Sequence, residues 1–105
     1  MPIDSRPLAS SCFVVATRNR PDDLLLTVQN LLEQTVLPEE LCIVDSNEVA
    51  STRDQIEQAC EKAGLLLMYV HPAPPGLPRQ RNIGIDRTKS DPIFFIDDDV
   101  RLNAT

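Results

Sequence analysis

The chain has 105 residues, of which 42% are hydrophobic and 25% charged, and its formal net charge at pH 7 is −6. This length suits one globular domain, and no apolar run approaches the roughly 20 residues of a membrane-spanning helix. The ten basic residues form no continuous patch, which argues against binding to nucleic acid. The N-terminus does not resemble a secretory signal, so we expect a cytoplasmic protein.

The first predicted element is a strand over residues 12–16. A polar break at residues 17–20 follows, with Asn19 as the expected N-cap of a helix and Pro21 in its first turn. That helix has its apolar residues on one face, namely Leu24, Leu25, Val28, Leu31 and Leu32.

Pro38 precedes a second predicted strand over residues 41–44. The next helix is expected to be capped by Ser51 or Thr52 and to end near Gly64. A third strand over residues 65–70, a Pro-rich segment over 71–76, a helix over about 78–88 and a fourth strand over 93–96 complete the pattern.

Strands that are continuous apolar runs, each followed by a helix, are typical of a parallel sheet covered on both faces. We therefore predict an α/β fold with a Rossmann-like parallel sheet and helices on both faces. Ligands bind such sheets beyond the carboxyl ends of the strands. The polar segments 17–20, 45–48 and 97–99 all lie at those ends, so we expect the functional site there.

Three consecutive carboxylates, Asp97, Asp98 and Asp99, directly follow the fourth apolar run. Carboxylates are poor strand formers and costly to bury, and a Mg²⁺ or Mn²⁺ ion would explain them. In an extended chain Asp97 and Asp99 point the same way, so these two are the candidate metal ligands. Asp98 points the opposite way, toward backbone or a neighbouring helix. The alternative is a solvated turn after the strand.

Four segments, in order, give the chain a family resemblance: V-V-A-T-R-N-R-P, L-C-I-V-D-S-N-E, G-L-P-R-Q-R-N-I-G-I and F-F-I-D-D-D. They resemble the opening strand, the second strand ending in Asp, the Arg-Asn-x-Gly segment and the D-x-D strand of inverting family 2 glycosyltransferases with the GT-A fold. The similarity runs from about residue 11 to residue 100. It implies that residues 1–105 are one nucleotide-sugar-binding domain, half of a GT-A domain, truncated after the D-x-D motif.

The resemblance also implies roles for single residues. Thr17 would lie against the nucleotide, Asp45 would accept a hydrogen bond from the base, and Arg81 would help to hold the nucleotide. Asp97 would face the ribose and Asp99 the metal. The implied donor is a UDP- or dTDP-linked sugar, and the acceptor is unknown. For Asp45 an equally weighted alternative is a turn-forming role with the two residues that follow it.

The arginines differ in their expected roles. On a helix Arg79 and Arg81 face different directions, and Arg79 fits a solvated surface charge. Arg18 and Arg20 lie in the loop after the first strand, at the edge of the sheet formed by the carboxyl ends of the strands. Arginines in such loops are more often exposed than bound to ligand. Gln80 departs from the family pattern, which often has a small residue before its Arg.

Inverting transfer needs a general base, and in the family this carboxylate follows the D-x-D strand, so no catalytic residue is assigned here. The predicted function of the intact protein is metal-dependent, inverting sugar transfer, to which this segment contributes the donor and metal site but no activity alone. A non-catalytic nucleotide-binding or interaction module is the alternative. A receiver-like or phosphatase-like domain fits poorly, because it would place an acidic cluster after the first strand. The fourth strand has no partner on its free side, which predicts self-association.

Overall fold

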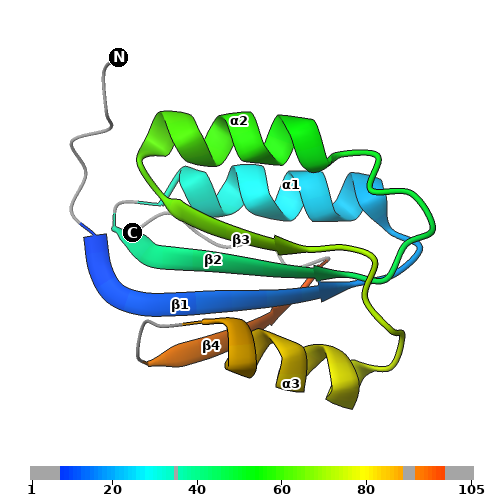
Figure 1. Ribbon diagram of the computed structural model, residues 1–105. Helices are drawn as coiled ribbons and strands as arrows, with labels where there is room; N and C mark the ends of the chain where they lie inside the picture. Colours follow the sequence, from blue (N-terminus) through cyan, green and yellow to red (C-terminus); the bar gives the residue numbers. More distant parts are fainter. Residues whose placement is uncertain (1–7, 35, 89–91, 99–105) are drawn as a thin grey trace.

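The computed structural model of the protein describes residues 8–34, 36–88 and 92–98. Strands and helices alternate along the chain, as the sequence predicts (Figure 1). The elements are β1 (Leu8–Thr17), α1 (Pro21–Leu32), β2 (Leu37–Asp45), α2 (Arg53–Ala63), β3 (Leu66–Val70), α3 (Leu77–Arg87) and β4 (Ile93–Asp97).

The four strands form one parallel sheet in the order β3-β2-β1-β4. The strand β1 is central and pairs with β2 on one side and β4 on the other. The strands β3 and β4 are therefore the edges of this sheet within the described part of the chain. The predicted α/β class and the parallel direction of the strands are confirmed.

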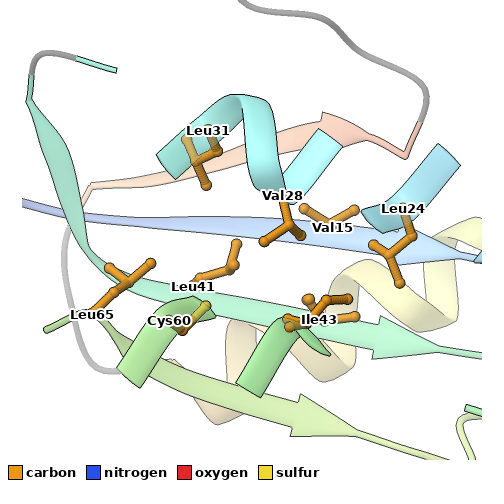
Figure 2. Packing of buried hydrophobic residues seen from close by; sticks show 9 residues of the cluster. Val15, Leu24, Val28, Leu31, Leu41, Ile43, Cys60 and Leu65 are labelled. Atoms are coloured by element: carbon orange, nitrogen blue, oxygen red, sulfur yellow. The ribbon is translucent and has the colours of Figure 1, made fainter. Parts of the chain in front are cut away.

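Helices cover both faces of the sheet, with α1 and α2 on one face and α3 on the other (Figure 1). Under α1 and α2 lies the larger core cluster, whose inward-pointing side chains are shown in Figure 2. Its buried members are Val15, Leu24, Val28, Leu31, Leu41, Ile43, Ile56, Cys60 and Leu65. Under α3 lies a smaller cluster of Cys12, Val14, Cys42, Val44 and Ala73. Alternate residues of each strand face the two clusters, as expected for a sheet covered on both sides.

Both N-terminal strands begin earlier than the apolar runs suggest. The strand β1 starts at Leu8, and β2 starts at Leu37 and includes Pro38, which is paired in register with Ala9. The register shifts between Ala9 and Cys12, and a proline is tolerated at such an irregular strand beginning because it needs no ladder hydrogen bond there.

The expected N-cap of α1 is wrong by one residue. The N-cap is Arg20, without a side-chain capping bond, and Pro21 is in the first turn as predicted. Asn19 has a φ of 62°, and its backbone N–H donates to the Asn47 side chain of the loop after β2. In α2 the positions agree with the prediction, since Thr52 is the N-cap residue, although its side chain makes no capping bond, and Gly64 ends the helix with a φ of 74°.

Among the described helices, none combines the length and the apolar character needed to cross a bilayer.

Candidate functional site

The carboxyl ends of the strands meet at one edge of the sheet, at the right of Figure 1. Thr17 at the end of β1 is the register partner of Asp45 at the end of β2. On the other side of β1, Ala16 is paired with Asp97, the last residue of β4. The structure therefore brings the three polar strand ends together along this edge.

Gln80 joins two of these strand ends. Its side-chain amide donates to the carbonyl oxygens of Thr17 and Val44, both at 3.1 Å, and the side chain is buried. This contact explains the departure from the small residue that the family often has at this place. Gln80 fixes the first turn of α3 beneath the carboxyl edge, which leaves the neighbouring Arg79 and Arg81 exposed.

The carboxylate of Asp45 is only 1% exposed and lies in a hydrogen-bond network. Its Oδ1 accepts from the backbone N–H and the side-chain amide of Asn47, both at 2.8 Å, and its Oδ2 accepts from the Tyr69 hydroxyl at 2.5 Å. The first of these bonds is the turn-forming role considered from the sequence. Burial, and then the bond to Asp45 and its negative charge, raise the pKa of Tyr69, so the phenol stays a hydrogen-bond donor.

Asn47 connects the loops after three strands. Besides holding Asp45, its side-chain oxygen accepts from the backbone N–H of Asn19, and its carbonyl oxygen lies 2.9 Å from Nε2 of His71. Asn47 is itself buried. The loops that follow β1, β2 and β3 are thus joined by hydrogen bonds and are not three independent turns.

Thr17 is 2% exposed and contacts the acidic segment directly. Its hydroxyl donates to Oδ2 of Asp98 at 3.0 Å, and Arg20 forms an ion pair with Oδ1 of the same carboxylate at 3.3 Å. The backbone carbonyl of Asp98 accepts from the hydroxyl of Thr27, in α1, at 2.7 Å. Asp98 therefore points toward the α1 side, which was one of the orientations expected from the sequence.

Asp97 and Arg81 lie on the α3 side of the same edge. Phe95 pairs with Val14 of the α3-side cluster, and Asp97 follows two residues later, so alternation along β4 places both on that face. Asp97 is exposed, and the guanidinium carbon of Arg81 lies 5.3 Å from the centroid of the Phe95 ring. The predicted site residues thus form two sets at one edge, Thr17 with Asp45 on the α1 side and Asp97 with Arg81 on the α3 side.

The acidic segment offers a limited donor set for a metal ion. Within residues 8–34, 36–88 and 92–98, no three His, Cys, Asp or Glu side chains are grouped as a metal site. Asp99 lies outside the described residues. The exposed carboxylate of Asp97 suits Mg²⁺ or Mn²⁺, because Mg²⁺ keeps several waters and often uses only one or two protein carboxylates.

The sequence indicates Asn47 only as a turn partner of Asp45 and Gln80 only as a departure from the family pattern, and it gives no role to Thr27 or Tyr69, although all four hold the site together. A signal was present for Thr27, which lies three residues after Leu24 and one before Val28 on the apolar face of α1, where a hydroxyl needs a partner. For Tyr69 the signal was a phenol near the end of an apolar strand. Their partners follow only from the packing.

The comparisons with known proteins agree with this architecture. The family model for glycosyl transferase family 2 matches residues 12–104, whereas none of the curated proteins matches the chain. The crystal structure of S. aureus TarS 1-349 superposes with a TM-score of 0.72 at 20% identity, over 90% of this chain and 29% of that chain. A second crystal structure of S. aureus TarS gives 0.68 at 20% identity, over 87% of this chain and 17% of that chain.

The chain therefore spans less than a third of the length of these solved structures, and the likeness at this identity concerns the fold. Its four-stranded parallel sheet corresponds to the N-terminal portion of a GT-A domain. Because the family model covers nearly the whole sequence, the chain belongs to glycosyl transferase family 2.

Proposed function

We propose that the intact protein transfers a sugar from a nucleotide diphosphate donor to an acceptor hydroxyl, with inversion, and that the carboxyl edge of this sheet binds the donor. The observation that carries the proposal is the meeting of Thr17, Asp45 and the acidic end of β4 at one edge, in a family 2 chain. Ligands of parallel sheets bind at this edge.

The base of a UDP- or dTDP-linked donor would contact Thr17 and Asp45. Asp45 is held by three hydrogen-bond donors and keeps further acceptor capacity on Oδ2, which suits the imide N–H of uracil or thymine. Both residues are almost inaccessible, so a covering side chain must move before the base reaches them. We therefore expect nucleotide binding to shift the amide signals of the loops after β1 and β2.

The diphosphate and the ribose would lie toward Asp97 and Arg81 on the other side of the edge. Asp97 and Asp99 would hold Mg²⁺ or Mn²⁺, and the bound cation would offset the negative charge that develops on the leaving diphosphate. Arg81 is exposed beside Phe95, where its guanidinium can hydrogen-bond to phosphate oxygens. No described residue is assigned as the general base.

Titration of the chain with UDP and Mn²⁺ tests the donor site. Calorimetry should report metal-dependent binding of UDP, and the Asp99→Ala variant should lose the metal dependence while its thermal melting stays unchanged. The matched control is Asp86→Ala, which removes an exposed carboxylate of α3 and should bind as the original chain does. Absence of binding to a folded original chain, or unchanged affinity of Asp99→Ala, would contradict the donor or the metal assignment respectively.

A non-catalytic nucleotide-binding or interaction module with this fold is the second candidate. The observation that favours it is that Asp45 and Asp98 are both engaged in internal hydrogen bonds, as in a structural network. The two candidates differ in chemistry, since only the first releases UDP from a UDP-sugar when an acceptor is present. An assay of that release, with the protein encoded by the complete reading frame, distinguishes them.

We also propose that the chain associates with itself through the free side of β4. This strand has backbone groups without a strand partner in the described sheet, and Phe94 and Phe95 are 49% and 40% exposed. An apolar strand at a sheet edge is a template for pairing with another chain.

A further inference from the structure

The two carboxylate oxygens of Asp45 accept hydrogen bonds unequally. Oδ1 accepts two, from the backbone N–H and the side-chain amide of Asn47, both at 2.8 Å. Oδ2 accepts from the Tyr69 hydroxyl at 2.5 Å, which is its single donor among the residues that the structure describes. A carboxylate has about four acceptor positions, two on each oxygen. Oδ1 is therefore filled, whereas Oδ2 keeps one position for a further donor.

The phenol ring of Tyr69 is held in turn by α2. The guanidinium carbon of Arg53, the first residue of this helix, lies 4.9 Å from the ring centroid, and its Nε forms an ion pair with Glu57 at 3.2 Å. Tyr69 also packs against the larger core cluster. Because burial and the bond to Asp45 raise the pKa of Tyr69, the hydroxyl keeps its proton and is the donor in this bond.

These bonds give the carboxylate of Asp45 one orientation. Asn47 bonds to Oδ1 and Tyr69 to Oδ2, so turning the carboxylate out of its plane would weaken the bonds at both oxygens. The open position on Oδ2 therefore has a fixed direction. Asp45 is 1% exposed, so a neighbouring side chain must move before a ligand reaches this position, but the carboxylate itself need not turn.

A fixed acceptor distinguishes between pyrimidine bases. N3 of uracil and of thymine carries a hydrogen that can be donated to Oδ2, whereas N3 of cytosine is itself an acceptor. We propose that Tyr69 and Asn47 are positioning residues for base recognition: they hold Asp45 so that the open position on Oδ2 faces N3 of the base, and thereby set a preference for uracil over cytosine. This inference rests on the proposed donor site, in which Asp45 contacts the base.

The test compares the affinities of the chain for UDP and CDP, measured by calorimetry at one saturating Mn²⁺ concentration. The two nucleotides share the ribose and the diphosphate, so the contributions of the metal and the phosphate contacts cancel in the ratio of the affinities. The original chain should bind UDP about 100-fold more tightly than CDP, because CDP leaves the charged acceptor on Oδ2 unpaired. Tyr69→Phe should reduce this ratio about ten-fold, because the carboxylate is then free to turn.

The ratio separates positioning from a purely structural role. If Tyr69 only stabilised the fold, Tyr69→Phe would weaken the binding of UDP and CDP by the same factor. The matched control is Thr88→Val, which removes a hydroxyl bonded to the carbonyl of Ile85 at 3.3 Å and should keep the original ratio. Thermal melting of each variant sets the temperature of the titrations, at which all the proteins compared are folded.

Asp45→Asn tests the contribution of Asn47. The two donors of Asn47 should bind the carbonyl oxygen of the new amide at the place of Oδ1. The amide nitrogen then lies at the place of Oδ2, where one of its hydrogens can be accepted by the Tyr69 oxygen and the other is directed at the base. This variant should therefore prefer CDP to UDP.

An unchanged ratio of affinities in Tyr69→Phe would overturn the role of Tyr69. A retained preference for UDP in Asp45→Asn would overturn that of Asn47, and equal affinities of the original chain for UDP and CDP would overturn the whole inference. A failure of the proposed donor site gives a different result, in which the folded original chain binds neither nucleotide.

Discussion

The carboxylate of Asp45 illustrates, at the scale of one residue, how the site is held. It is buried at the end of β2 and accepts hydrogen bonds from Tyr69 and twice from Asn47. A buried carboxylate is tolerated only when its oxygens are paired in this way. The loss in the free energy of unfolding therefore depends on which partner of this network is removed.

Tyr69→Phe removes one donor to a charged acceptor and should lower the free energy of unfolding by about 1.5 to 3 kcal/mol. Asp45→Ala should cost more, because it leaves the Tyr69 hydroxyl and the Asn47 amide without an acceptor. The effects should not add in the double variant, since both act on one bond. Urea denaturation of the three variants measures this, and additive losses would show that the bond contributes nothing to stability.

The three thiols predict a fall in stability at alkaline pH. Burial raises the pKa of Cys12 and of Cys60 from 9.0 to about 12 and that of Cys42 to about 11. Below pH 9 the thiols are protonated in both states. Above it the unfolded chain releases protons that the folded chain retains, so stability falls with rising pH, by about 1.4 kcal/mol per pH unit for each thiol.

Cys60→Ala should reduce the thiol contribution to this alkaline slope by about one third, because it removes one of three thiols, while the buried Tyr69 phenol, whose pKa is also raised, adds to the slope above pH 10 in both proteins. The unfolding free energy measured in urea between pH 9 and pH 10.5 gives the slope. The variant is also expected to be less stable at pH 7, since Cys60 is buried in the core, so the slope and not the absolute value is diagnostic. An unchanged slope would mean that burial does not keep the Cys60 thiol protonated in the folded state at these pH values.

At the scale of elements, the packing of α3 on β1 depends on Gly84. A Cβ atom at this position would lie 2.4 Å from Cγ1 and 3.2 Å from Cγ2 of Val14. The glycine of the Arg-Asn-x-Gly segment is therefore required for close approach of the helix to the sheet. This approach also places Gln80, one turn earlier, against the ends of β1 and β2.

Gly84→Ala should lower the free energy of unfolding by about 1 to 3 kcal/mol through overpacking, despite the higher helix propensity of alanine. Combining it with Val14→Ala should recover part of the loss, because the smaller side chain makes room for the new methyl group. Thermal melting of the single and double variants tests the packing. If Gly84→Ala melts at the original temperature, the contact with Val14 does not limit the position of α3.

Sequence patterns predicted the elements well where local forces decide and less well where a distant contact intervenes. The apolar face of α1 and the glycine stop of α2 follow from periodicity and capping, which depend on neighbouring residues. Asn19 is a favourable N-cap in isolation, yet its backbone bonds to Asn47 and the cap moves to Arg20. Here a contact between two loops outweighs the preference of one residue.

At the scale of the whole molecule, the edge of the sheet at β4 is the surface through which we propose that the chain associates with itself. The ring of Phe94 packs edge-to-face against the ring of Phe13, with the two centroids 5.6 Å apart. Phe94 nevertheless remains 49% exposed. The other edge strand, β3, exposes Leu66 at 57%. Because β4 exposes two adjacent aromatic residues, one on each face, we expect association at this edge rather than at β3.

Sedimentation velocity at rising concentration should therefore detect association of the chain. Phe94→Lys places a charge on the β4 edge and should shift the equilibrium to the monomer, whereas Leu66→Lys on the opposite edge should not. A monodisperse monomer at all concentrations for the original chain would rule out the proposed self-association. A stronger effect of Leu66→Lys would assign the contact to β3 instead.

The order of the elements, the parallel α/β class and the polar residues at the strand ends can all be predicted from the sequence, because they follow from apolar runs and turn residues that act locally. The strand order β3-β2-β1-β4 and the hydrogen-bond partners of the site residues become known only from the packed fold. Tyr69 bonds to Asp45 across 24 residues and Thr17 to Asp98 across 81. Such contacts depend on how distant elements pack, which no local pattern of residues specifies.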